Sequence, residues 1–306
     1  MNLRCDPILK DYFHNSEHFS DMFNALFYDG KQVISPSIID SDSDSSSLFD
    51  MNHHDIIAIN RTRDILFDAT FVLIGIENQG FVDYTMPLRN LLYDALTYNK
   101  QYRLYQQEKK KNKHTQLHLI PVISVVFYYG EKHWSAPRSL LEMMDIPQIY
   151  QNHKINDWNI HIVDIKDIDL SLLHNDDNRK LVDGVQRLYR WDGNLEHLED
   201  ITLSRDVAIA VAAITGKIEL LNTLEEEKGD VIHMCSSIEK CLNKGRQDGF
   251  MQGQVSTIIK QLKSKLNLPE EIILKIEQSS QEQIEKLTIH IFDINSQEDI
   301  LHLLSS

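Results

Sequence analysis

The sequence predicts an α/β fold, in which a central β-sheet flanked by helices precedes an all-α C-terminal region. Two apolar runs, Phe71–Ile76 and Leu119–Tyr128, lack the polar and apolar alternation of half-exposed strands, so each is predicted to be a strand buried on both faces. Segments with helical spacing of apolar residues precede and separate these runs. From Glu225 onward the chain is more polar and carries helix signals.

Two helices are predicted on either side of the first apolar run. Residues 6–28 carry apolar side chains near helical spacing, and Asp29-Gly30 ends this helix. A second helix begins near Met86, with Thr85 as its cap and a proline in its first turn. Its predicted apolar stripe consists of Leu88, Leu91, Leu92, Ala95 and Leu96.

Later segments complete the predicted α/β part. Residues 159–165 suggest a further strand, and residues 179–191 and 206–221 suggest two helices. The second of these helices is apolar nearly all round, which is typical of a buried supporting helix.

We expect three regions along the chain: residues 1–222 as the α/β domain, 223–253 as a helical linker, and 254–306 as a small helical domain. In the linker, glycine recurs at every fourth residue from Gly245 to Gly253. Because each glycine weakens a helix by up to about 1 kcal/mol, this stretch is predicted to be pliant or closely packed.

Composition narrows the class of protein. The 306 residues are 42% hydrophobic and 25% charged, as in globular proteins, and the apolar runs of about ten residues are too short to span a bilayer. The chain opens without a secretion leader pattern, and its three cysteines lack Cys-x-x-Cys spacing, so we expect a reducing cytoplasmic location and no membrane partner. A net charge of −15 argues against a dedicated DNA-binding protein, although a catalytic cleft needs only a local positive patch.

The first apolar run ends in Glu77-Asn78-Gln79, which is an unusual end for a buried strand. Side chains two apart on a strand share a face, so Glu77 and Gln79 are predicted to point the same way. A buried carboxylate without a partner costs several kcal/mol, so a cation or a hydrogen-bond network is expected beside Glu77. This is the pattern expected of a metal site on a sheet.

The helix that begins near Met86 carries a second candidate group on another face, formed by Arg89, Tyr93 and Lys100. A basic segment from Lys100 to His114 follows, which we place in the connection to the next strand. Two interpretations of the lysines remain open: they lie on a solvated loop or they contact phosphate groups. Arg89 is a candidate to pair with a structural acid.

Several stretches together resemble the Rpn-like recombination-promoting nuclease/putative transposase family, within the PD-(D/E)XK nuclease superfamily. They are, in order, Lys10-Asp11-Tyr12-Phe13, Phe23-Asn24-Ala25, Arg63-Asp64-Ile65, Ile74 to Gln79, Met86-Pro87-Leu88-Arg89, Tyr93 to Tyr98, and Pro121 to Gly130 with Trp134. These motifs cover roughly the first two-thirds of the chain in family order, which single motifs rarely do by chance.

The resemblance implies a PD-(D/E)XK, restriction-endonuclease-like core in residues 1–222, with a central mixed sheet flanked by helices, and a divalent metal site. Asp64 and Glu77 are then the expected ligands, and the backbone carbonyl of Asn78 is a third oxygen. Asp68 competes with Asp64, and Asp55 is a weaker alternative. Hard oxygen donors without a neighbouring cluster of cysteine or histidine favour Mg²⁺ or Mn²⁺ over Zn²⁺.

Within that site the resemblance implies a further role for each remaining candidate. Gln79 stands where the superfamily has lysine, so it cannot act as a base, although its amide oxygen can orient a water. Arg89 and Tyr93, on the helix that follows the catalytic strand, are expected near the phosphate of a DNA substrate, and Lys100 on the same helix face is a further candidate contact.

Two functions are therefore carried forward. The first is a metal-dependent DNA endonuclease linked to recombination, transposition or defence. The second is a catalytically weak or inactive relative that acts as a protein-interaction scaffold, which the acidic charge and Gln79 favour. In either case, the C-terminal helical region is expected to serve partner contact, including a homodimer.

Overall fold

The computed structural model describes residues 5–38, 40–41, 47–48, 59–60, 65–68, 72–150 and 154–305. Contacts divide the chain into two compact units, Met1–Ser237 and Ile238–Ser306. The first unit is a mixed α/β structure and the second is helical, as the sequence predicts. None of the helices in the described part of the chain is long and apolar enough to cross a membrane.

A mixed sheet forms the centre of the first unit. Its strand order is β1-β4-β5-β6-β7, with β1 and β4 antiparallel to their neighbours and β5, β6 and β7 parallel. The strands are β1 (Asp40–Ser41), β4 (Ile65–Asp68), β5 (Leu73–Gln79), β6 (Val122–Tyr128) and β7 (His161–Asp164). Two small antiparallel pairs accompany it: β2 (Ser47–Leu48) with β3 (Ile59–Asn60), and β8 (Thr202–Ser204) with β9 (Val231–His233).

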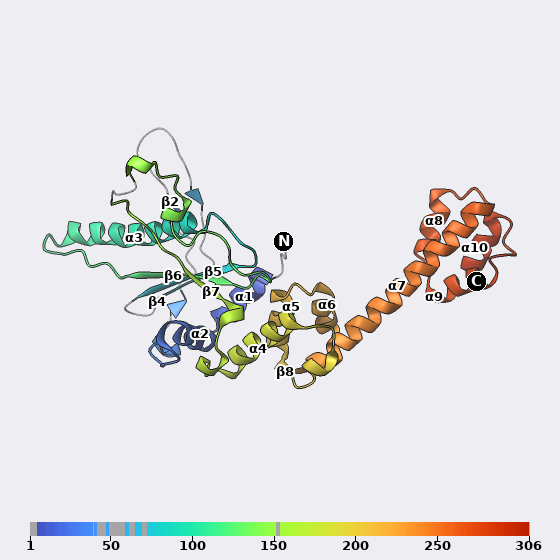
Figure 1. The fold of residues 1–306 in the computed structure, drawn as a ribbon, viewed down its shortest axis with the longest axis horizontal. Helices are drawn as coiled ribbons and strands as arrows, with labels where there is room; N and C mark the ends of the chain where they lie inside the picture. Colours follow the sequence, from blue (N-terminus) through green and yellow to red (C-terminus); the bar gives the residue numbers. More distant parts are fainter. Residues whose placement is uncertain are drawn as a thin grey trace. The chain divides into compact units, whose positions relative to one another are not determined.

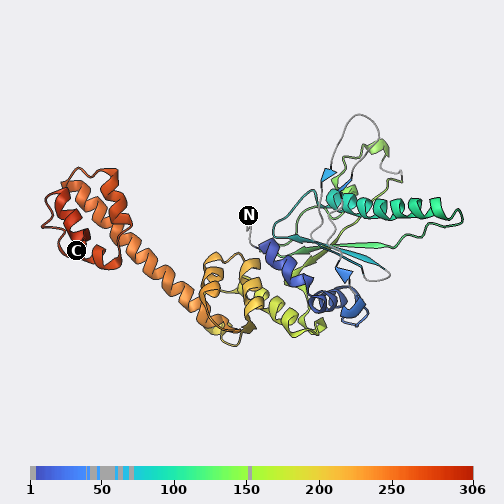
Figure 2. The ribbon, with the colours of Figure 1, turned by 180° about the vertical axis from the view of Figure 1, so that it is seen from behind.

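Helices lie on both faces of this sheet (Figures 1 and 2). Helix α3 (Met86–Lys111) connects the parallel strands β5 and β6 and packs against β6. Helices α1 (Cys5–His14) and α2 (Ser16–Tyr28) lie on the opposite face, where Phe13 of α1 meets Phe127 of β6 with ring centroids 5.2 Å apart. The remaining helices of this unit are α4 (Asp176–Arg190), α5 (Arg205–Ile214) and α6 (Ile218–Glu226). Short 3₁₀ helices occur at Pro36–Ile38, Leu141–Met143, Gln148–Tyr150, Ile165–Asp167, Leu170–Leu172 and Leu195–Leu198.

The prediction of a single helix over residues 6–28 is wrong, because Asn15 interrupts it. Its side chain accepts hydrogen bonds from the backbone N–H groups of Glu17 and His18 and so starts α2 anew. The predicted end is confirmed: Asp29 and Gly30 have φ values of 51° and 76°, in the left-handed region that closes a helix.

The prediction of one helix over residues 206–221 is also wrong. Helix α5 ends at Ile214, and Gly216 follows with φ of 68°, a conformation that glycine adopts without strain. Helix α6 then begins at Ile218. The buried character of α5 is confirmed, since Val207, Ala210 and Val211 are at most 1% exposed.

The second unit has a core of its own. It contains most of α7 (Met234–Lys265), with α8 (Glu270–Glu277), α9 (Gln281–Ile289) and α10 (Gln297–Ser305). Leu262, Ile276 and Leu287 are fully buried in one apolar cluster. Helix α8 follows Pro269, and Ser280 precedes α9, where it forms a capping box with Gln283.

Candidate active site at the end of the central strand

Strand β5 carries the Glu-Asn-Gln sequence as its last three residues, and all three side chains are buried. Glu77 is 1% exposed, and Asn78 and Gln79 are each 6% exposed. In the parallel ladder, Glu77 pairs with Val126 and Gln79 pairs with Tyr128 of β6. Side chains alternate between the two faces along a strand, and paired residues of neighbouring strands lie on the same face. Glu77 and Gln79 are two residues apart, so both point to the α3 side. Asn78 pairs with Phe127, whose ring faces α1, so its side chain lies on the other side.

The group beside Glu77 is the guanidinium of Arg89 on α3. Arg89 Nη2 lies 3.2 Å from Glu77 Oε2 and 3.3 Å from the hydroxyl oxygen of Tyr93, and its Nη1 lies 2.6 Å from Asp83 Oδ2. The cation expected next to the buried carboxylate is therefore present within the chain. The side chain of Arg89 is 23% exposed, so part of it reaches solvent.

These contacts shift the pKa values of Arg89 and Asp83. Burial alone would lower the pKa of Arg89, but hydrogen bonds with Tyr93 and Asp83 and the charge of Glu77 raise it. Burial alone would raise the pKa of Asp83, yet hydrogen bonds from Thr85 and Arg89 hold it below its usual value. Two carboxylates around one guanidinium leave a formal charge of −1, so the cluster attracts a further cation more than an anion.

The turn between β5 and α3 places Arg89. Asp83 Oδ1 accepts hydrogen bonds from the backbone N–H and the hydroxyl of Thr85, and α3 begins at Met86 as predicted. Thr85 occupies the cap position, but its hydroxyl bonds Asp83 rather than the helix. Met86 is fully buried against Val126 and Tyr128, which holds the first turn of α3 against the sheet.

The predicted apolar stripe of α3 is confirmed at Leu96, which is 4% exposed, and wrong at Leu88 and Ala95, which are exposed, because the buried face also includes polar residues. Leu88 is 45% exposed, whereas Asn90 is fully buried and Asp94 is 3% exposed. Asp94 accepts hydrogen bonds from the hydroxyl of Ser124 in β6 and, at 3.1 Å, from the indole N–H of Trp158. Both polar atoms of the Asn90 side chain lack a hydrogen-bond partner among the described residues.

Sequence reasoning missed Asp83, Asn90 and Asp94. A signal for the last two was present, since polar residues at positions 90, 94 and 97 fall on one helix face together with Tyr93. When the polar face of a helix is turned toward a sheet, its buried polar side chains are expected to form hydrogen bonds there.

The predicted partners on α3 separate into two places. Arg89 and Tyr93 lie together, with the guanidinium carbon 5.9 Å from the ring centroid, and Tyr93 is 5% exposed. Lys100 is exposed and lies about 16 Å further along the helix axis, at 1.5 Å per residue. The placement of the basic segment in a loop is wrong for its first part, because α3 continues to Lys111 and carries Lys109 to Lys111 in its last turn.

Asp64 and Asp55 lie outside the described residues. The register next to Asp64 is described: Ile65 pairs with Ile76 in the antiparallel ladder, and the residues that flank this pair in the sequence are Asp64 and Glu77. Asp68 pairs instead with Leu73, which lies four residues before Glu77. This separation corresponds to about 13 Å along β5. The backbone register therefore separates Asp68 from Glu77.

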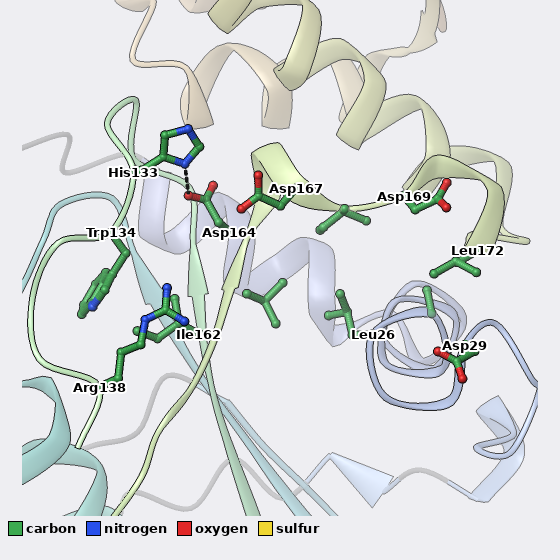
Figure 3. Close-up of a pocket in the computed structure, with 13 residues that line it drawn as sticks. Leu26, Asp29, His133, Trp134, Arg138, Ile162, Asp164, Asp167, Asp169 and Leu172 are labelled. Carbon is green, nitrogen blue, oxygen red and sulfur yellow. Dashed lines mark hydrogen bonds and ion pairs between the residues drawn. The ribbon is translucent and has the colours of Figure 1, made fainter. Parts of the chain in front are cut away.

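A second cluster of potential ligands lies elsewhere in the first unit. Within the described residues, ligand atoms of His133, Asp164 and Asp167 lie within 4.8 Å of one another, in a cavity of about 380 Å³. Figure 3 shows His133 beside Asp164, and the two lie 3.3 Å apart. Lys166 Nζ lies 2.8 Å from the other oxygen of Asp164. The two carboxylate oxygens of Asp164 are therefore already paired, one with His133 and one with Lys166. The arrangement is that of a surface ion-pair cluster.

Comparison with known protein families gives a match for part of the chain. The family model described as "Putative transposase, YhgA-like" matches residues 60–207, a range that contains every candidate site residue from Asp64 to Lys100. No curated protein and no solved structure matches the chain.

Proposed function

Because residues 60–207 belong to the family of YhgA-like putative transposases, we propose that the protein is a metal-dependent DNA endonuclease. The reaction is hydrolysis of phosphodiester bonds, in DNA recombination, transposition or defence, on a core of the PD-(D/E)XK type. The observation that carries this proposal is the buried Glu77 carboxylate at the carboxyl end of the central strand, with Gln79 on the same face. Ligand and catalytic sites of sheets with parallel strands commonly lie at this end.

The donor set fits a hard divalent cation. Glu77 and Asp83 outnumber the single guanidinium of Arg89, and Oε1 of Gln79 is buried without a hydrogen-bond partner among the described residues. We assign Asp64, Glu77 and the backbone carbonyl of Asn78 as the groups that would hold Mg²⁺ or Mn²⁺. When bound, the ion would neutralise phosphate charge and lower the pKa of a bound water.

The assignment of Asp64 is supported by the register of its described neighbours. Ile65 pairs with Ile76, the residue that precedes Glu77 on β5. Asp68, the competing acid, pairs four residues away from Glu77 and is disfavoured.

The protein's own side chains then have distinct roles. Gln79 orients a water through its amide oxygen, since a neutral amide cannot accept the proton as a base. Arg89 holds the Glu77 carboxylate in position, and Tyr93 supports Arg89 from the same helix. The exposed part of the Arg89 side chain and, further along α3, Lys100 contact the DNA backbone.

The scaffold function is the second candidate. Arg89 already neutralises Glu77, as in a purely structural ion pair, and the net charge of −15 opposes general DNA affinity. In this interpretation the buried pair stabilises the fold and the protein acts through protein partners.

Nicking of supercoiled plasmid by the full-length protein tests the endonuclease. We expect nicking with Mg²⁺ or Mn²⁺ and none with a chelator. Glu77→Gln and Asp64→Asn should each lower the nicking rate by at least about 100-fold, as expected when a metal ligand or its charge is lost. Glu108→Gln makes the same chemical change at an exposed carboxylate of α3 and should leave the rate unchanged.

The variants must first be shown to fold, because Glu77 is buried beside Arg89. Circular dichroism and urea unfolding of each variant supply this check. Wild-type rates in Glu77→Gln and Asp64→Asn would refute the site. Absence of nicking by wild-type protein in every metal tested would refute the endonuclease and leave the scaffold.

A further inference from the structure

A cavity of about 780 Å³ opens beside the candidate active site, at the carboxyl ends of β5 and β6. Its volume lies within the usual range of small-molecule sites. Gln79 and Arg89 belong both to its wall and to the candidate active site, so an occupant of the cavity lies next to the reacting group. The end of α5 closes another side of it.

The described lining residues carry no excess of positive charge that would attract a polyanion. Arg89 and Glu131 are the charged side chains that line the cavity among the described residues, and they carry opposite charges. Three of the other lining residues, Phe81, Tyr129 and Tyr189, are aromatic. A neutral flat ring with polar edges fits this lining better than a phosphate group.

Two of the aromatic rings are held in place by the fold. The hydroxyl of Tyr189 lies within hydrogen-bond distance of the carbonyl oxygens of Tyr129 and Ile214. The ring of Tyr129 packs over Gly80, where an added Cβ would lie only 2.8 Å from Tyr129 Cε2. Phe81, in contrast, is 54% exposed and is free to adjust to an occupant.

A buried acceptor in the wall points to a bound donor. Gln79 is 6% exposed, and its Oε1 has no hydrogen-bond partner in the described part of the chain. Buried amide oxygens are nearly always satisfied, so a group that occupies the cavity is expected to supply the missing N–H or O–H. Water and the amino groups of nucleobases both do so.

We propose that this cavity holds one nucleobase of the DNA substrate, unstacked from its neighbours, next to the phosphate that is cut. The proposal rests on the proposed endonuclease function and adds a preference to it. Taking a base out of a paired duplex costs unpairing and unstacking, and this cost is smallest for a base that is already unpaired. The enzyme should therefore bind and cut DNA with an unpaired nucleotide better than a fully paired duplex.

The test uses the full-length protein and two labelled duplexes that differ by one unpaired nucleotide. Binding is measured by fluorescence anisotropy with Ca²⁺ in place of Mg²⁺, and cutting is measured with Mg²⁺ or Mn²⁺. We expect wild type to prefer the duplex with the unpaired nucleotide by about tenfold, the effect of one stacked base. Phe81→Ala and Phe81→Leu should reduce this ratio to about one, because both lose the flat aromatic face.

Tyr84→Ala is the matched control. Tyr84 is an aromatic residue of the same turn, is 61% exposed, and is not among the residues that line the cavity. It should keep the tenfold preference. Urea unfolding of each variant checks that the exposed positions tolerate the changes.

The outcomes separate the two proposals. If wild type cuts both duplexes at equal rates and binds them equally, the base site is refuted and the endonuclease stands. If Phe81→Ala and Tyr84→Ala behave alike, the base site is also refuted. If neither duplex is cut in any metal, the endonuclease is refuted, and a preference in binding that depends on Phe81 still supports a base site.

Discussion

Arg89 Nη2 lies 3.2 Å from Oε2 of Glu77, and the carboxylate has 1% of its side chain exposed. This ion pair joins the central strand β5 to the first turns of α3, twelve residues later in the chain. Loss of one partner leaves a buried charge without its counter-charge, which costs far more than the pair contributes.

We predict that Arg89→Met destabilises the protein by about 3–5 kcal/mol, since Glu77 then remains buried and charged. The double variant Glu77→Gln/Arg89→Met should be less destabilised than Arg89→Met alone, because no buried carboxylate is left. Urea unfolding of the wild type, both single variants and the double variant measures this coupling. If the stability lost in the double variant equals the sum of the losses in the two single variants, the two side chains do not interact in solution.

Asp83 gives a prediction on pH. Its folded pKa is depressed below the usual 3.8, because the hydrogen bonds from Thr85 and Arg89 outweigh burial. A depressed folded pKa contributes stability above the unfolded value, and this stability is lost as the pH falls through the folded value. The free energy of unfolding of wild type should therefore exceed that of Asp83→Asn by about 1 kcal/mol at pH 6. This difference should disappear as the pH falls below 3.8.

Unfolding curves at several pH values measure this difference. Glu108→Gln, at an exposed carboxylate of the same helix, is the control and should follow wild type throughout. A difference between wild type and Asp83→Asn that stays constant down to pH 2.5 would contradict the assignment of the lowered pKa to Asp83.

The sequence predicted the parts of this fold that depend on local signals. Buried strands β5 and β6 follow from unbroken apolar runs, and the start of α3 follows from Thr85 and Pro87. The breaks at Asn15 and Gly216 were missed, although residues 14–18 carry no apolar side chain and Gly216 is a residue type that commonly ends helices.

The buried face of α3 could not be predicted from hydrophobic periodicity. Asp94 is buried because it meets Ser124 and Trp158, which lie 30 and 64 residues away in the sequence. The contact between Glu77 and Arg89 likewise depends on how the turn at Asp83 directs α3 back along β5. Such partners are set by tertiary structure, so the sequence gives the residue types but not the pairs.

The Asp94 cluster gives a third prediction. Asp94→Ala removes the acceptor for both the Ser124 hydroxyl and the Trp158 indole, so about 2–4 kcal/mol of stability should be lost. Ser124→Ala removes one donor and should cost less. Leu88→Ala changes an exposed residue of the same helix and should cost under about 0.5 kcal/mol.

Urea unfolding midpoints rank the three variants of this series. An Asp94→Ala protein no less stable than Leu88→Ala would mean that the buried network does not hold α3 against β6. A large loss of stability in Leu88→Ala would instead indicate that Leu88 is buried, as hydrophobic periodicity predicts.

The basic end of α3 gives a prediction on DNA affinity. Lys109, Lys110 and Lys111 occupy the last turn of α3, are exposed, and lie about 30 Å along the helix from Arg89. If this end follows the DNA backbone, replacing all three lysines by glutamine should weaken binding at low salt. It should also reduce the slope of log K against log salt by about 0.9 for each lost phosphate contact.

Anisotropy titrations over a range of salt concentrations measure that slope. The control removes the same charge from the second unit, at Lys240, Lys260 and Lys263, which are also exposed. Because both variants shift the net charge of the protein equally, a general electrostatic effect would lower the slope in both. A smaller salt slope in the α3 variant alone would locate the DNA path along this helix. A slope in the α3 variant equal to that of wild type would show that DNA does not follow this helix.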